Sequence, residues 1–357
     1  MKKKELKVVD LFAGVGGLSL GFEMLGAKTV LANEFDADIA KSYQKNRPNV
    51  KMLVEDITKL DLKETFDSYK SKVDVVVGGP PCQGFSQKGQ RKSINDERNF
   101  LFRYYVEVVK LLQPKYFVME NVPNLLTTEN GFFKDEIKSL FNQLGYTINP
   151  MVLNAADYGV PQNRHRAVII GKKGSEKVEM IKPLKKQTTA WDAISDLAFL
   201  ESGEGEFKQE YMMAAETDYQ KQMRKKSSQL FNHCVTAHSA DAIKKLKLIP
   251  PEKGKEYLPQ KMLTKSIYSG TWSRIEKDKV SVTITTRFDT PSSGRFSHPF
   301  LNRAITVREA ARLQSFPDYF VFYGNKSSQM KQVGNAVPPL LAKAIAQAIY
   351  NDMEKKS

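Results

Sequence analysis

Short apolar runs, rich in β-branched and aromatic side chains, recur through the first half of the chain and are separated by polar or amphipathic stretches. We expect strands at residues 6–12, 29–32, 50–57, 73–77, 116–123, 152–155 and 162–171. Apolar residues at helical spacing predict helices at 18–25 and 98–112. Strands that alternate with helices predict an α/β fold with a doubly wound, mostly parallel, Rossmann-like sheet.

The chain changes character at Lys172. From there to about residue 300 it is polar and charge-dense, with few long apolar runs. Residues 280–287 alternate like a half-buried strand, and 288–295 have the composition of a loop. We expect a second, smaller and irregular domain over about 172–321, with 1–171 and about 322–357 forming the first domain.

Helical signals return near the C-terminus. Thr306 and Glu309 have the spacing of a capping box in front of a helix at 309–315, which Pro317 ends. A last helix follows two prolines, and its apolar residues lie largely on one face: Leu340, Leu341, Ile345 and Ile349.

The charge balance predicts a polyanionic partner. The 357 residues include 55 Lys and Arg against 40 Asp and Glu, a net charge of +15, and nucleic acid is the first candidate for such a chain. No apolar run is long enough to cross a membrane, so we expect a cytoplasmic, nucleoid-associated protein without membrane contact. The two cysteines exclude a disulfide framework, and we expect no metal site.

One cysteine has an unusual setting. The apolar run at 73–77 leads into Gly78-Gly79-Pro80-Pro81 and then Cys82. Loops at the carboxyl ends of strands are where chemistry gathers in an open α/β sheet, and two prolines stiffen the approach to the sulfur. We interpret Cys82 as a nucleophile, against the alternative of a small buried hydrophobic residue.

Glycines and acids follow the first three predicted strands. Gly14, Gly16 and Gly17 form a tight loop that allows close approach of a ligand, although Ser19 stands where a dinucleotide-binding fingerprint has its last glycine. Glu34 and Asp56 end the next two strands, where carboxylates reach a ribose or a base. An ordinary solvated acid is the alternative for each.

A further acid and two arginines complete the candidate chemistry. Glu120 ends an apolar strand, where a buried carboxyl group becomes a good proton donor if burial raises its pKa. Arg164 and Arg166 would lie on one face of a strand by period two. Such a pair is suited to bind a carboxylate, a base carbonyl or a phosphate. The alternative is an ordinary pair of surface side chains.

The segments Gly78 to Ser86, Glu120-Asn121-Val122 and Gln162-x-Arg164-x-Arg166 stand in the order typical of one family. They resemble the C5-cytosine-specific DNA methyltransferases of the bacterial type, which belong to restriction–modification systems or stand alone. The resemblance implies a cofactor-binding and catalytic first domain and a target-recognition second domain. It also implies methyl transfer from S-adenosyl-L-methionine to carbon 5 of a flipped-out cytosine, through a covalent Cys82 adduct with Glu120, Arg164 and Arg166 assisting.

The same resemblance implies two sets of binding residues. Those expected at the methyl donor are Phe12, Gly14, Gly16, Gly17, Glu34, Asp56, Ile57, Pro80, Leu101, Asn335 and Val337. Those expected at DNA are Ser86, Lys88, Arg91, Arg98, Arg287 and Arg295. The basic segment at 87–93 is expected to close over the substrate.

We expect a monomer whose physical partner is double-stranded DNA. A cognate restriction endonuclease is expected as a genetic partner rather than a physical one. Two other functions stay open at this point. A tRNA cytosine-5 methyltransferase would share Cys82 and Glu120, although such enzymes usually differ where this chain has Gly84-Phe85-Ser86. A non-catalytic nucleic-acid-binding protein of the same fold is the other.

Overall fold

The computed structural model describes residues 5–81, 101–263 and 269–355. The chain divides into two compact units. The first contains residues up to 154, residues 165–183 and residues from 339 onward, and the second contains residues 155–164 and 184–338.

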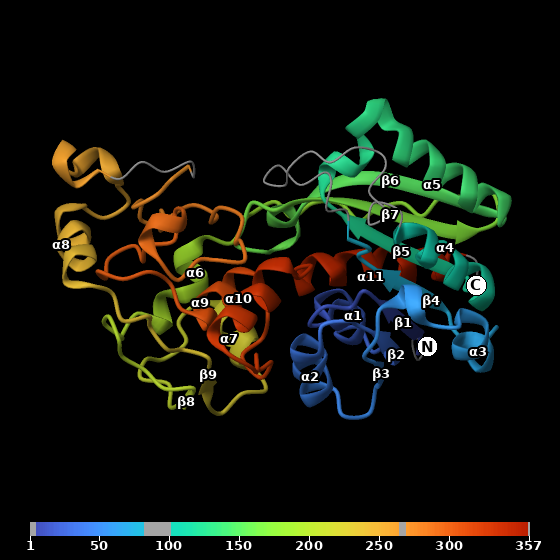
Figure 1. The fold of residues 1–357 in the computed structure, drawn as a ribbon, viewed down its shortest axis with the longest axis horizontal. Helices are drawn as coiled ribbons and strands as arrows, with labels where there is room; N and C mark the ends of the chain where they lie inside the picture. The colour runs from blue at the N-terminus through green and yellow to red at the C-terminus, as the bar shows by residue number, and fades with distance from the viewer. Residues whose placement is uncertain (1–4, 82–100, 264–268, 356–357) are drawn as a thin grey trace. The chain divides into compact units, whose positions relative to one another are not determined.

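The first unit is built on a seven-stranded sheet (Figure 1). Its order is β3-β2-β1-β4-β5-β7-β6; β1 to β5 are parallel, and β7 runs antiparallel to both of its neighbours. The strands are β1 (Lys7–Leu11), β2 (Lys28–Asn33), β3 (Lys51–Leu53), β4 (Val75–Gly78), β5 (Tyr116–Asn121), β6 (Tyr146–Asn154) and β7 (His165–Lys173). The predicted doubly wound α/β sheet is therefore confirmed. The strand order reverses between β1 and β4, which is where such sheets bind ligands.

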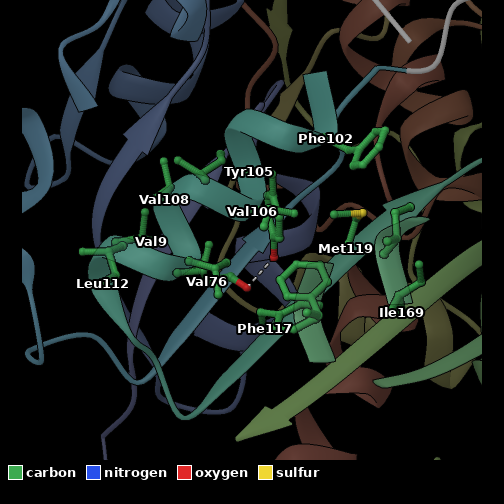
Figure 2. Close-up of a cluster of buried hydrophobic side chains, with 14 of the residues drawn as sticks. Val9, Val76, Phe102, Tyr105, Val106, Val108, Leu112, Phe117, Met119 and Ile169 are labelled. Atoms are coloured by element: carbon green, nitrogen blue, oxygen red, sulfur yellow. Dashed lines mark hydrogen bonds between the residues drawn. The ribbon is translucent and has the colours of Figure 1, made fainter. Parts of the chain in front are cut away.

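Helices α3 (Leu62–Phe66), α4 (Leu101–Leu112) and α5 (Phe132–Gln143) contribute to one large apolar core with the sheet (Figure 2). Tyr105 of α4 is fully buried there, and its hydroxyl donates to the carbonyl oxygens of Val76 and Val118, each 2.9 Å away. Phe117 of β5 stacks on Phe141 of α5 with ring centroids 3.8 Å apart. This packing fixes the ends of β4 and β5, which carry the candidate chemistry.

Helices α1 (Gly17–Glu23) and α11 (Pro339–Glu354) pack closely on each other, and α2 (Ala37–Asn46) follows β2. Gly21 permits the approach, since a Cβ there would lie 2.4 Å from the Cβ of Ala342. Asp352 fastens α11 to the sheet through Lys172 and the Tyr116 hydroxyl, both at 2.8 Å. The predicted C-terminal helix is thus confirmed.

The second unit has little regular structure. Its helices are α6 (Ala190–Ile194), α7 (Asp218–Arg224), α8 (Ala240–Leu248), α9 (Val307–Leu313) and α10 (Lys326–Asn335), and β8 (Lys208–Gln209) pairs with β9 (Leu230–Phe231). The capping box at the start of α9 is present as predicted, with Thr306 and Glu309 bonding reciprocally. Residues 155–164 and 322–338 belong to this unit, whereas we expected them in the first; residues 172–183, which we expected here, belong to the first unit.

The predicted strand at 280–287 is wrong. Within this stretch the structure has a single bridge, between Gln162 and Ser281. The Ile284 amide donates to the Gln162 side chain at 2.8 Å, and the Thr283 hydroxyl donates to the carbonyl oxygen of Asn163 at 2.7 Å. Side chains and one short bridge take the place of the neighbouring strand that the alternating pattern suggested.

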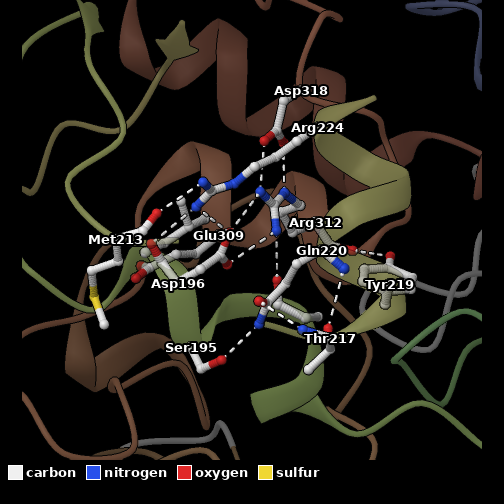
Figure 3. Close-up of polar contacts among 12 residues, drawn as sticks. Ser195, Asp196, Met213, Thr217, Tyr219, Gln220, Arg224, Glu309, Arg312 and Asp318 are labelled. Atoms are coloured by element: carbon white, nitrogen blue, oxygen red, sulfur yellow. Dashed lines mark hydrogen bonds and ion pairs between the residues drawn. The ribbon is translucent and has the colours of Figure 1, made fainter. Parts of the chain in front are cut away.

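Buried ion pairs stand among the buried apolar side chains of the second unit. Figure 3 shows Arg312 of α9 between Asp318, at 2.5 Å, and Asp196, at 3.2 Å. Arg224 adds a second cation to Asp196 at 2.5 Å. Burial alone would raise the pKa of Glu309, but Arg303 at 2.8 Å holds it down at about 2. Charge-dense sequence is therefore compatible with a compact interior here, because each of these charges has a partner.

Candidate active site

The predicted glycine loop leaves β1 at the point where the strand order reverses. Phe12, Gly14 and Gly16 have positive φ angles of 52°, 55° and 84°. Gly16 caps α1, and a Cβ there would lie 2.5 Å from the ring of Tyr43. Glycine is needed at position 16 for both its conformation and the close approach of the Tyr43 ring.

Glu34 is held against this loop at the end of β2. Its side chain is nearly buried, and its two oxygens accept from the amides of Gly14 at 2.8 Å and Asp36 at 2.9 Å. Burial raises the pKa of Glu34, and these amide hydrogen bonds work against the rise. A carboxylate oxygen accepts more than one hydrogen bond, so Glu34 can still receive the hydroxyls of a sugar.

Asp56 begins a short 3-10 turn, Ile57–Lys59, just after β3. One of its oxygens accepts from the Thr58 amide at 3.0 Å and hydroxyl at 2.9 Å, and Ile57 is buried behind it. Phe35 was missed by the sequence analysis. Its side chain is 70% exposed directly after Glu34, and an exposed ring at a strand end is a platform on which a planar base can stack. The signal was an aromatic residue next to a strand-end acid.

The ends of β4 and β5 are joined by close contacts. Pro80 is buried, and its carbonyl oxygen accepts from the Asn121 amide group at 2.7 Å. A Cβ at Gly79 would lie 3.0 Å from Oε2 of Glu120, so glycine lets the turn after β4 pass directly over this acid. Cys82 follows two residues after Pro80 and lies outside the described residues, as do Ser86, Lys88, Arg91, Arg98 and the segment 87–93.

Glu120 pairs with Arg166 on the neighbouring strand β7. The Nε of Arg166 donates to Oε1 of Glu120 at 2.9 Å, and both side chains are largely buried. Burial lowers the pKa of Arg166, while the charge of Glu120 and its hydrogen bond raise it. The Nη1 of Arg166 also donates to the carbonyl oxygen of His165 at 2.7 Å, which holds the guanidinium group in place. The fold therefore brings Glu120 and Arg166 together, and their catalytic roles stay a prediction.

Arg164 does not share a strand face with Arg166, which corrects the prediction from period two. β7 begins at His165, and Arg164 belongs to the second unit. Its guanidinium is buried and donates to the carbonyl oxygens of Ile284 at 3.0 Å, Gly334 at 2.7 Å and Ala336 at 3.1 Å. Gly334 and Ala336 flank Asn335, so Arg164 holds the C-terminal end of α10, where Asn335 lies. A catalytic role for Arg164 stays a prediction.

The remaining predicted residues lie in different parts of the chain. Leu101 begins α4 and packs against the core of the first unit. Asn335 and Val337 lie in the second unit, and their contact with a methyl donor stays a prediction. Arg287 is exposed, whereas Arg295 is partly engaged with Glu276 and the carbonyl oxygen of Arg274, both at 3.2 Å.

The described residues offer neither a membrane-spanning helix nor a metal-binding cluster. None of the described helices is both long enough and apolar enough to cross a membrane. Within the same ranges, His, Cys, Asp and Glu side chains nowhere gather in a group of three or more that could hold a metal ion.

A doubly wound sheet, a glycine loop at its switch point and an acid–arginine pair at the next strand ends define a Rossmann-like transferase. The chain belongs to the C-5 cytosine-specific DNA methylase family, whose model matches residues 6–351. Its predicted family and enzyme class, DNA cytosine-5-methyltransferase, are thereby confirmed.

Relatives match over nearly the whole chain. Type II methyltransferase M1.HphI of Haemophilus parahaemolyticus is 40% identical over 96% of this chain and 86% of its own length. Type II methyltransferase M.DdeI of Desulfomicrobium norvegicum is 38% identical over 96% and 88%.

Solved structures agree with the fold. A structure described as a DNA modification methyltransferase encoded within a prophage (E. coli) has a TM-score of 0.80 at 27% identity, covering 98% of this chain and 100% of that one. The Dnmt2 methyltransferase of S. pombe, at 16% identity and a TM-score of 0.60, covers 99% and 100% and shows likeness of fold alone.

Proposed function

We propose that this DNA cytosine-5-methyltransferase moves a methyl group from S-adenosyl-L-methionine to carbon 5 of a cytosine in a specific duplex sequence, through a transient bond from Cys82 to carbon 6. The observation that carries the proposal is the Glu120–Arg166 pair at 2.9 Å, directly under the turn that leads to Cys82. That arrangement suits a pyrimidine ring attacked at one edge and held at the other.

The chain's own groups have distinct tasks in this scheme. The Cys82 thiolate adds to carbon 6, and the electron pair displaced from the ring double bond makes carbon 5 nucleophilic. Glu120 holds a proton at ring nitrogen 3, and Arg166 orients the base through its carbonyl oxygen. Once carbon 5 carries the methyl group, a base takes its remaining proton, the ring double bond forms again and the Cys82 thiolate leaves. General acid help of this kind is worth about 100- to 10,000-fold in rate.

S-adenosyl-L-methionine supplies an electrophilic methyl group when it is bound. The glycine loop and the acid beside it fit this donor, because a Cβ at Gly14 would meet no atom within 4 Å and Glu34 keeps acceptor capacity for ribose hydroxyls. Phe12 and Phe35 offer rings for adenine, and Asp56 accepts from its amino group. The other donor contacts we propose are Gly17, Ile57, Pro80, Leu101, Asn335 and Val337.

The target carbon is inaccessible inside a duplex. We therefore propose that the cytosine leaves the stack, at a cost of about a few kcal/mol, and that the segment at 87–93 fills the gap. The net charge of +15 supports attraction to the phosphate backbone. Lys88, Arg91, Arg98 and Arg287 are the cations we propose at DNA, with Ser86 and Arg295 beside them.

Covalent trapping tests the scheme. Duplexes with 5-fluorocytosine at the methylated position, found beforehand by bisulfite sequencing of a plasmid from expressing cells, should form a stable adduct with the wild-type chain and donor. Cys82→Ser should form none while it still binds S-adenosylhomocysteine. Cys234→Ser is the matched control, because this second thiol is half-buried in the other unit and has no place in the scheme.

An adduct retained by Cys82→Ser, or absent from the wild type at a known site, would refute the covalent route. Methyl incorporation into tRNA but not duplex DNA would favour the tRNA-directed alternative.

A further inference from the structure

A buried arginine stands behind the glycine loop. Arg47 follows α2 as its C-cap residue and is 7% exposed. Its Nη2 donates to the carbonyl oxygen of Gly16 at 2.8 Å, and its Nη1 donates to that of Val15 at 3.3 Å. Both acceptors belong to the loop between β1 and α1, so one guanidinium grips two successive peptides of this loop.

The charge of Arg47 is balanced by a carboxylate that lies outside the glycine loop. Its Nε donates to both carboxylate oxygens of Glu23, at 2.9 and 3.1 Å, and the Thr29 hydroxyl donates to the same carboxylate at 2.6 Å. The guanidinium carbon lies 4.5 Å from the centre of the Tyr43 ring. Arg47 is therefore held on three sides, by an acid, a ring and the loop carbonyls, and its fork has little freedom to turn.

The loop is fitted to this arrangement. A Cβ at Gly16 would lie 2.8 Å from Nη1 of Arg47, as well as 2.5 Å from the Tyr43 ring. The Ser19 hydroxyl donates to the Gly16 carbonyl oxygen at 3.3 Å from the other side. The positive φ of Gly16 and the direction of its carbonyl group are thus set together by side chains from α1 and α2.

We propose that Arg47 is a positioning residue for the methyl donor: it holds the Val15–Gly16 stretch in the conformation that binds S-adenosylmethionine, without touching the donor or the cytosine. This inference rests on the proposed function of the glycine loop. Lysine at position 47 would keep the charge but not the planar fork, so it could not satisfy both carbonyls and Glu23 at once. The loop would then lose its conformation while the Glu120–Arg166 pair stays unchanged.

The test separates donor binding from chemistry on the base. Arg47→Lys is compared with the wild type in KM for S-adenosylmethionine, in the dissociation constant of S-adenosylhomocysteine by calorimetry, and in kcat at saturating donor. A further assay follows exchange of the cytosine carbon 5 hydrogen with tritiated water in the absence of donor, which needs addition of Cys82 but no methyl group. We expect KM and the dissociation constant to rise tenfold or more, with kcat and exchange within threefold of wild type.

Lys172→Met is the matched control. Lys172 is likewise a buried cation of the first unit, paired with Asp352 at 2.8 Å, and it does not contact the loop. Its loss should lower the unfolding midpoint and leave both donor constants within twofold. If Arg47→Lys does not fold, Glu23→Gln, which removes the balancing charge, must raise the donor KM at least threefold.

Unchanged donor constants in folded Arg47→Lys, or unchanged KM in Glu23→Gln where that variant is needed, would overturn the positioning role. Loss of exchange at unchanged donor affinity would overturn it too, since it would place Arg47 with the base chemistry. If the wild type methylates DNA and Arg47→Lys has the same donor constants, only this inference fails. A wild type that neither binds S-adenosylhomocysteine nor methylates DNA defeats the proposed function itself.

Discussion

Asp10 is the penultimate residue of β1, and we expect its carboxyl group to make the first unit less stable as the pH rises. The residue is 1% exposed, and its Oδ2 has no hydrogen-bond partner among the described residues. Burial raises its pKa from 3.8 to about 7, although the nearby Ser19 hydroxyl and the charge of Arg47 act in the opposite direction.

The sign follows from proton binding. In the unfolded chain Asp10 loses its proton near pH 3.8, whereas in the folded chain it keeps the proton up to about pH 7. Between these values the folded state binds more protons, so the free energy of unfolding falls as the pH rises. The difference of 7 − 3.8 = 3.2 pKa units corresponds to about 4 kcal/mol, lost between about pH 4 and pH 7.

Asp10→Asn removes this dependence, because asparagine has nearly the same shape and does not ionise. The variant and the wild type should be similarly stable near pH 4. The variant's advantage should then grow towards about 4 kcal/mol at pH 7 and level off above it. Asp38→Asn, at an exposed position in α2, is the control and should show no such trend.

The assay has to report on the first unit. The two tryptophans, Trp191 and Trp272, both lie in the second unit, so their fluorescence does not follow β1. Amide hydrogen exchange of β1 and β4 between pH 4.5 and pH 8, in increasing urea, measures the relevant opening free energy. An advantage of Asp10→Asn that is equal at pH 5 and pH 8 would refute the reasoning.

Three further changes test other parts of the structure. Glu120→Gln should keep a hydrogen bond to Arg166 and leave the affinity for duplex DNA little changed, but it should slow single-turnover methylation by about 100- to 10,000-fold. A normal rate would exclude Glu120 as the acid. Asp318→Asn removes one of the two acids paired with Arg312 and should lower the free energy of unfolding of the second unit by about 3–5 kcal/mol. Urea unfolding followed by tryptophan fluorescence measures this, and an unchanged midpoint would contradict it. Gly171→Ala places a Cβ 1.9 Å from the Phe117 ring and should weaken protection of β5 amides by about 1–3 kcal/mol, whereas full protection would show that the ring moves freely aside.

The predictions that succeeded rest on local signals. Apolar runs such as those that became β4 and β5 must be buried wherever they lie, and glycines with positive φ, as at Gly16, mark a loop in any context. The end of each parallel strand lies on the same edge of a sheet, so the sequence also placed Glu34 and Glu120 at that edge. That Glu120 and Arg166 would act together came only from the resemblance to the family.

The failures concern partners that are distant in sequence. The alternation at 280–287 resembles a strand, but its groups bond to the segment around Gln162 instead of to a ladder. Arg164 stands two residues before Arg166, as a pair on one strand face would, yet its acceptors are carbonyl groups more than a hundred residues away in the sequence. A period-two pattern carries no information about such acceptors.

The sequence by itself determined the sheet, its glycine loop, the strand-end acid and the family. The tertiary structure alone decided that Arg164 bonds to the end of α10, that Arg47 bonds to the glycine loop, and that paired charges are buried in the second unit. The physical reason is that burial and backbone conformation are written in neighbouring residues, whereas the acceptors of a buried guanidinium are supplied by whichever segments the completed fold brings to it.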